Sequence, residues 1–135
     1  MTFEPPIPIL RIFDEDKARA FYVGFLGFAV EWEHRFEPGT PIYMQVRLGE
    51  ARLHLSEHFG DATPGSRLRI KCDDVDAYCA GLNAKGYKYS RPGAEDMPWG
   101  TRDTTISDPF GNRLTFWSDT AKPNADRPFN RSAPP

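Results

Sequence analysis

Residues 107–116 read Ser-Asp-Pro-Phe-Gly-Asn-Arg-Leu-Thr-Phe. The Pro-Phe-Gly-Asn segment is typical of a tight turn, because proline presets the backbone for a turn and glycine tolerates a positive φ angle. Alternating apolar and polar residues on both sides predict strands over 101–107 and 114–117. The stretch therefore predicts two strands joined by a turn, and the rest of the chain can be compared with it.

The order of elements that leads to this turn occurs twice. Asp14 and the acidic residues after it are typical of a helix N-terminus, and the apolar spacing predicts a helix over 15–25. In the first half the expected strands are 7–13, 28–33, 42–48 and 53–56. The second half begins with a strand at 67–72 and a helix from Asp73. A short strand at 87–90 and a loop at 91–100 follow, and then the two strands on either side of the turn.

The two halves also share sequence. Arg52-Leu53-His54-Leu55 corresponds to Arg113-Leu114-Thr115-Phe116, 61 residues later. A repeat of this length indicates duplication of one structural unit that buries its sheet against its own helix. We predict an α+β protein of two βαβββ modules, 1–60 and 61–118, followed by a flexible Pro-rich tail at 119–135.

Composition excludes several classes of function. The chain has 135 residues, of which 39% are hydrophobic and 13% aromatic, so we expect one domain with a real core. Its formal net charge of -2 gives no general attraction to nucleic acid or anionic membranes. No stretch is long enough for a membrane span and no secretory signal precedes the first strand, so we expect a cytoplasmic protein.

Two motifs resemble a known superfamily. Asp14-x-x-x-Ala18-x-x-Phe21-Tyr22-x-x-x-Leu26-Gly27-Phe28 and the 107–116 stretch are similar to the hallmarks of the vicinal oxygen chelate superfamily, which includes glyoxalase I, extradiol dioxygenases and bleomycin-resistance proteins. The resemblance covers about residues 7–117, and the segment 98–102 is particularly similar to the bleomycin-resistance branch. It implies a cup-shaped mixed sheet with helices on the convex side.

The resemblance also implies where a metal would bind. The ligand positions of metal-using members correspond to Ile7, His54, Arg67 and Thr115. Of these only His54 is an ordinary ligand, whereas metal chemistry generally needs three or so His, Asp, Glu or Cys side chains. We expect no metal and no other cofactor, although an alternative site made of His54, Glu57 and His58 stays open.

Two classes of function remain for such a protein. By resemblance to the metal-free bleomycin-resistance branch, we expect a homodimer that binds a small molecule, and an antibiotic is one candidate. The alternative is an enzyme of the same superfamily, such as a lyase, isomerase or dioxygenase, with His54 as a general base or an unrecognised metal site. A protein-interaction module is a third interpretation.

Strand alternation predicts which side chains would line the cup. The apolar sides of the strands should pack on the helices, which leaves a basic opposite side. The arginines on this basic side need partners of opposite charge. These are either the carboxylates of Glu31, Glu33 and Asp103 or a bound planar organic anion. The arginines would disfavour bleomycin, which is cationic. The predicted ligand-binding residues are Arg52, His54, Arg67, Arg69, Trp99, Asp103, Thr115 and Trp117.

The three tryptophans receive separate predictions. In a regular strand Trp32 points to the same side as Phe28 and Val30, so we expect it in the core. Trp99 lies in a Pro/Gly-rich loop, where it either covers a planar ligand or packs in a dimer. Trp117 ends the last strand and could form an aromatic wall of the cup.

Overall fold

The computed structural model describes residues 1–120 and divides the chain into two units. Unit 1 consists of Met1–Leu68 together with Ser107–Arg113, and unit 2 consists of Arg69–Ile106 together with the described residues from Leu114 to Thr120. Both follow the predicted βαβββ order, so the α+β class is confirmed. The module boundaries at 60 and 118 stay predictions. The tail predicted from residue 119 lies outside the described residues, apart from Asp119 and Thr120.

The first sheet has four strands in the order β1-β4-β3-β2. Strand β1 (Ile9–Arg11) is parallel to β4 (Ala51–Ser56), whereas β3 (Tyr43–Leu48) is antiparallel to both β4 and β2 (Ala29–His34). The predicted turn at Gly49 is confirmed, and its φ angle of 60° explains the need for glycine.

The predicted helix at 15–25 forms, but only its first turn is a regular α-helix. The segment α1 (Glu15–Ala18) begins after Asp14, whose carboxylate accepts a hydrogen bond of 2.9 Å from the backbone N–H of Lys17. It continues as a wider π-helix, η1 (Arg19–Phe25). The amide of Leu26 accordingly donates to the carbonyl of Phe21, five residues earlier.

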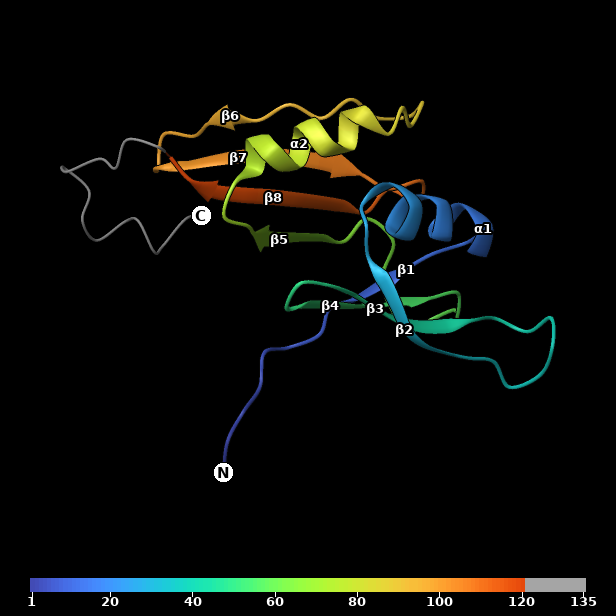
Figure 1. The fold of residues 1–135 in the computed structure, drawn as a ribbon. Coiled ribbons are helices and arrows are strands. Elements are labelled where there is room, and N and C mark those ends of the chain that lie inside the picture. The colour runs from blue at the N-terminus through green and yellow to red at the C-terminus, as the bar shows by residue number, and fades with distance from the viewer. Residues whose placement is uncertain (121–135) are drawn as a thin grey trace. The chain divides into compact units, whose positions relative to one another are not determined.

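The second sheet has the order β5-β8-β7-β6 (Figure 1). Its strands are β5 (Arg67–Lys71), β6 (Glu95–Asp96), β7 (Thr101–Ser107) and β8 (Arg113–Asp119). Helix α2 (Val75–Ala84) begins after the capping residue Asp74 and lies along this sheet, with Tyr78 4.8 Å from the Phe116 ring. The short strand predicted at 87–90 is wrong, because Pro92 and the turn before it interrupt pairing and β6 forms later.

Strand alternation was correct for most of the core. Leu53 and Leu55 are buried in the first sheet, and Leu114 and Phe116 in the second. On β5 the apolar side is only half-buried, at Leu68 and Ile70. Two residues that were expected on the polar side, Ser56 and Thr115, are fully buried.

The prediction that Trp32 belongs to the core is wrong. Val30 pairs with Val46, but Trp32 pairs with Gln45, so one extra residue, Glu31, is inserted into β2. Such a β-bulge reverses the alternation of all residues that follow it. Trp32 is consequently 43% exposed and lies on the polar side of the first sheet.

The 107–116 turn is held by one carboxylate. Both backbone N–H groups at Phe110 and Asn112 donate to Oδ1 of Asp108 at 2.8 Å, and the Tyr22 hydroxyl donates to Oδ2 at 2.6 Å. The Asn112 side chain then donates to the carbonyl of Arg11 at 2.9 Å. The turn, the helix and the end of β1 are therefore joined within unit 1.

No helix in residues 1–120 is long and apolar enough to cross a membrane. The cytoplasmic location stays a prediction.

Tyr22→Phe tests the contribution of this buried hydrogen bond. We expect the free energy of unfolding to fall by about 1–3 kcal/mol, because a buried oxygen of Asp108 loses a donor. Tyr89→Phe, at a tyrosine that is 74% exposed, should change it by less than about 0.5 kcal/mol. Urea denaturation measures both, and equal effects would contradict the structural role of the Tyr22 hydroxyl.

Candidate functional site

The polar side of the first sheet is built by three neighbouring strands. Gln45 pairs directly with His54, and Arg47 pairs with Arg52, so these side chains share one side. The β-bulge brings Trp32 beside Gln45 on the same side.

Three rings form a compact cluster there. Trp32 and Tyr43 are stacked, with their centroids 6.0 Å apart and an angle of 11° between the planes. The His54 ring lies edge-on to both, at 5.3 Å from Trp32 and 5.0 Å from Tyr43. Distances of this kind are typical of favourable aromatic contacts.

A chain of hydrogen bonds fixes the tautomer of the neutral His54 ring. The Glu31 carboxylate can only accept, so Gln45 donates to it through Nε2, at 2.8 Å, and turns Oε1 toward the imidazole. Nε2 of His54 must then donate to Oε1 at 2.8 Å, which leaves Nδ1 to accept from the Tyr43 hydroxyl at 2.6 Å. Both ring nitrogens are therefore engaged when the imidazole is neutral.

The environment favours that neutral form. Burial lowers the pKa of His54, since loss of water disfavours the imidazolium. Burial, and to a lesser extent Asp61, raises the pKa of Tyr43, so its hydroxyl keeps the proton that it donates. The lone pair a general base would use is thus occupied by a neutral tyrosine.

The predicted charge compensation by Glu31 is present. Its Oε1 accepts from Arg52 at 3.2 Å, and Arg47 lies 3.7 Å from Oε2. The hydrogen bond from Gln45, followed by the one from Arg52, lowers the pKa of Glu31. Glu33 instead pairs with Arg19, at 2.8 Å.

In unit 2 a second group surrounds Arg69. Its guanidinium donates to Asp103 at 3.0 Å, and the Thr101 hydroxyl donates to the same carboxylate at 2.7 Å. Arg69 and Lys71 also lie over the Trp117 ring, at 5.4 and 5.0 Å from its centroid. Arg69 is therefore already paired, and the role of Trp117 as an aromatic wall stays a prediction.

The remaining predicted residues lie apart from these contacts or are buried. Thr115 is fully buried and shares a hydrogen bond of 2.7 Å with Thr105. Arg67 is exposed and forms no ion pair with any residue in the described part of the chain. Nε1 of Trp99 and Nε of Arg69 are buried without a hydrogen-bond partner, which is uncommon for donors in native proteins.

The donor set implied by the resemblance does not fit a metal ion. Ile7, Arg67 and Thr115 cannot replace carboxylate or imidazole ligands, and both nitrogens of His54 are already engaged. Within residues 1–120 no three His, Cys, Asp or Glu side chains are grouped closely enough to hold one, the alternative set of His54, Glu57 and His58 included.

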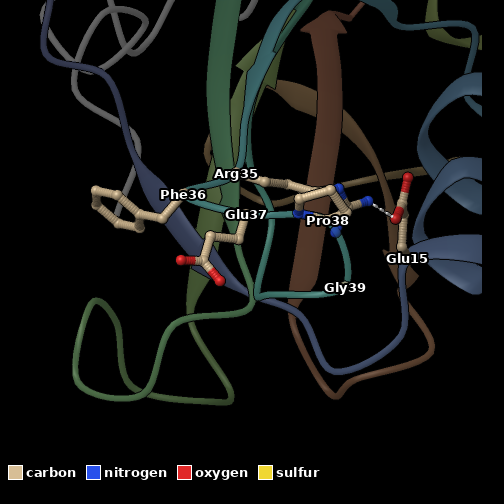
Figure 2. Close-up of a pocket in the computed structure, with 6 residues that line it drawn as sticks. All are labelled: Glu15, Arg35, Phe36, Glu37, Pro38 and Gly39. Atoms are coloured by element: carbon tan, nitrogen blue, oxygen red, sulfur yellow. Dashed lines mark hydrogen bonds and ion pairs between the residues drawn. The ribbon is translucent and has the colours of Figure 1, made fainter.

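A surface depression in unit 1 lies away from these residues. It is lined by Glu15 and the 35–39 segment, and Figure 2 shows Arg35 reaching toward Glu15 while Phe36 points away. Arg35 pairs with Glu15 and also donates to the carbonyl of Thr40 at 2.8 Å. Arg35 and Glu15 therefore neutralise each other in this open depression.

Five of the eight predicted residues lie in two separate groups. In unit 1, Arg52 and His54 are connected through Glu31 and Gln45. In unit 2, Arg69 contacts both Asp103 and Trp117. Trp32, Tyr43 and Gln45 join these groups although they were not among the predicted residues. The alternation of β3 already placed Gln45 opposite the buried Met44 and Val46, so it could have been found. Trp32 gave no such signal, because a bulge is not visible as periodicity.

The fold and this polar side define a class of small α+β proteins built from two βαβββ units. A family model described as "Glyoxalase superfamily protein" matches residues 1–122. The chain belongs to the glyoxalase superfamily. A search of curated proteins finds no match.

Solved structures agree with this assignment. TnmS3, an antibiotic binding protein from Streptomyces sp. CB03234, is 29% identical, with a TM-score of 0.65 over 89% of this chain and 100% of that one. A glyoxalase/bleomycin resistance protein from the same organism is 31% identical, with a TM-score of 0.60 over 82% and 98%. The bleomycin-binding protein of Streptomyces verticillus, solved with copper(II)-bleomycin, is 27% identical, with a TM-score of 0.64 over 89% and 99%.

The protonation of His54 can be measured directly. Its pKa should lie below the ordinary value of 6.5, so the unfolded chain takes up a proton first as the pH falls. Stability should therefore decrease from pH 6.5 downward and level off below the folded pKa, and His54→Gln should lose this part of the pH dependence. NMR titration of the ring and urea unfolding across this range measure both; a midpoint above 6.5 would contradict the prediction.

Proposed function

We propose that this protein is a metal-free small-molecule binding protein of the glyoxalase/bleomycin-resistance type, with an antibiotic as a candidate ligand. The observation that carries the proposal is the state of His54. Its Nε2 donates to Gln45 and its Nδ1 accepts from Tyr43, so neither nitrogen is available for a metal or a substrate proton. We therefore infer that the site offers a ligand side-chain surfaces whose orientation is fixed by the hydrogen bonds of His54 to Gln45 and Tyr43.

The similar structures support the same function. TnmS3 is described as antibiotic binding, and the Streptomyces verticillus protein as bleomycin-binding. Both are below 30% identical to this chain, so they support the class of function and leave the ligand open.

The alternative is an enzyme that uses His54 as a general base. A neutral imidazole at physiological pH is the correct form for a base, and this favours the alternative. A substrate would, however, have to displace the Tyr43 hydroxyl from Nδ1. Mutation separates the two interpretations, because a base is indispensable for turnover whereas a structural imidazole affects ligand affinity.

The test combines metal analysis with ligand screening of the full chain. After dialysis we expect well below one transition metal ion per chain, and in a thermal shift screen of antibiotics that includes bleomycin we expect at least one compound to raise the melting temperature without being converted. About one metal ion per chain that His54→Ala removes, or turnover that His54→Ala abolishes, would establish the enzyme instead. A screen in which no compound raises the melting temperature would also contradict the proposal.

We further propose that the protein is a homodimer. Strands β1 and β5 are each the outermost strand of their sheet, so each leaves one edge without a strand partner among residues 1–120. Strand edges of this kind readily pair with a second copy. The interface would then include the segments 7–13 and 66–72.

Sedimentation velocity at micromolar concentration measures the assembly. We expect a particle of about twice the 15.3 kDa chain mass. Ile9→Lys places a charge on the β1 edge and should shift the protein toward the monomer, whereas Thr63→Lys in an exposed loop should not. A wild-type monomer would refute the proposal.

A further inference from the structure

Arg67 and Arg113 are two arginines of unit 1 whose charges have no partner. Both are exposed, and neither guanidinium forms an ion pair or a hydrogen bond with any residue of 1–120. In the first repeat the position of Arg113 is occupied by Arg52, which is paired with Glu31 at 3.2 Å. The second repeat therefore has the cation without the carboxylate.

Backbone hydrogen bonds place the two arginines directly opposite each other. The amide of Arg113, the first residue of β8, donates to the carbonyl of Ser66 at 2.9 Å. The first sheet shows the same pattern, because the amide of His54 donates to the residue before its partner Ile9. Arg67, the residue after Ser66, is thus the partner of Arg113. Paired side chains point to the same side of a sheet, where opposed like charges are destabilising.

A hydroxyl group lies on the other side of Arg113. In the hairpin of β7 and β8 the hydroxyls of Thr105 and Thr115 face each other at 2.7 Å. Two residues nearer the turn, the same register places the exposed Ser107 opposite Arg113. Arg67, Arg113 and Ser107 therefore form a row across the neighbouring strands β5, β8 and β7 (Figure 1), and all three belong to unit 1. We call these three residues the arginine row.

The carboxylates nearest to the arginine row along β7 are engaged elsewhere. Asp108 follows Ser107, but it is buried and accepts hydrogen bonds from its own turn and from a buried tyrosine. Asp103, further along the polar side of β7, accepts from Arg69 and Thr101. The arginine row thus offers two guanidinium groups and a hydroxyl, and no carboxylate among residues 1–120 pairs with either cation.

We propose that the arginine row binds the dianionic phosphate group of a small phosphate monoester. Guanidinium groups bind phosphate oxygens through paired N–H donors, and two of them match the two negative charges of the phosphate. The Ser107 hydroxyl supplies one more donor for a remaining oxygen. The inference goes beyond the proposed function, which needs no acidic group in its ligand and rests on other residues.

Two probes with the same ring and different charge test the proposal. At pH 7.5 phenyl phosphate is mostly a dianion, because its second pKa lies at about 6, whereas benzenesulfonate is a monoanion. NMR titration of the full chain in phosphate-free buffer measures both affinities through the arginine Nε–H signals. We expect phenyl phosphate to bind at least about 5-fold more tightly at low salt, to shift the signals of Arg67 and Arg113, and to be displaced by inorganic phosphate.

Substitutions locate the binding. Arg67→Gln and Arg113→Gln should each weaken phenyl phosphate binding at least about 5-fold, because each removes a charge-assisted contact. Ser107→Ala, which removes a neutral donor, should weaken it about 2- to 5-fold. The matched control is Arg102→Gln, which removes the same charge from an arginine already paired with two carboxylates, and it should change affinity by less than about twofold.

Melting temperatures separate binding from folding. Without phosphate, Arg113→Gln removes one of two opposed like charges, so its melting temperature should not fall below that of the wild type. A lower value would contradict the unpaired state of Arg113. Phenyl phosphate should raise the melting temperature of the wild type more than that of this variant.

The outcomes are distinct from those of the antibiotic screen. The arginine row is refuted if phenyl phosphate does not bind, if benzenesulfonate binds as tightly, or if Arg102→Gln weakens binding as much as Arg113→Gln. None of these results affects the proposed function, which the screen and the metal analysis test through other residues.

Discussion

The Asp108 carboxylate is the interaction on which unit 1 depends. It accepts two backbone N–H groups of its own turn and the Tyr22 hydroxyl, and its partner Asn112 reaches the carbonyl of Arg11. Burial, followed by the charge of Asp108, raises the pKa of Tyr22, so the hydroxyl remains a donor. One acidic side chain thus joins segments nearly a hundred residues apart in sequence. Because a buried carboxylate is costly without donors, each partner is needed for the others.

The candidate site depends on a smaller irregularity. A single inserted residue, Glu31, turns Trp32 from the expected core to the polar side of the sheet and supplies the carboxylate that orients Gln45. Gln45 orients His54, and His54 orients Tyr43. The single bulge in β2 therefore places Trp32 beside Tyr43 and also supplies the first carboxylate of the hydrogen-bond chain that orients Tyr43.

His54 occupies a position that the resemblance assigns to a metal ligand, but here its partners are protein side chains. A ligating imidazole needs a free lone pair, and in this chain that lone pair accepts the Tyr43 hydroxyl. The arginines behave likewise: Arg52 and Arg69 are paired with Glu31 and Asp103, so the basic side expected from the sequence is largely neutralised within each unit. His54 and both arginines are therefore engaged with side chains of their own unit.

The sequence by itself determined the order of elements, the helix caps at Asp14 and Asp74, and most of the buried strand positions, because these follow from local spacing. It also indicated that His54, Arg52, Arg69 and Asp103 share polar sides of strands. Only the tertiary structure decided where Trp32 points and that the Tyr87–Ser90 segment is not a strand. It alone decided that both nitrogens of His54 are engaged. A bulge, a strand partner and a hydrogen-bond partner are fixed by residues distant in sequence, and periodicity carries no information about them.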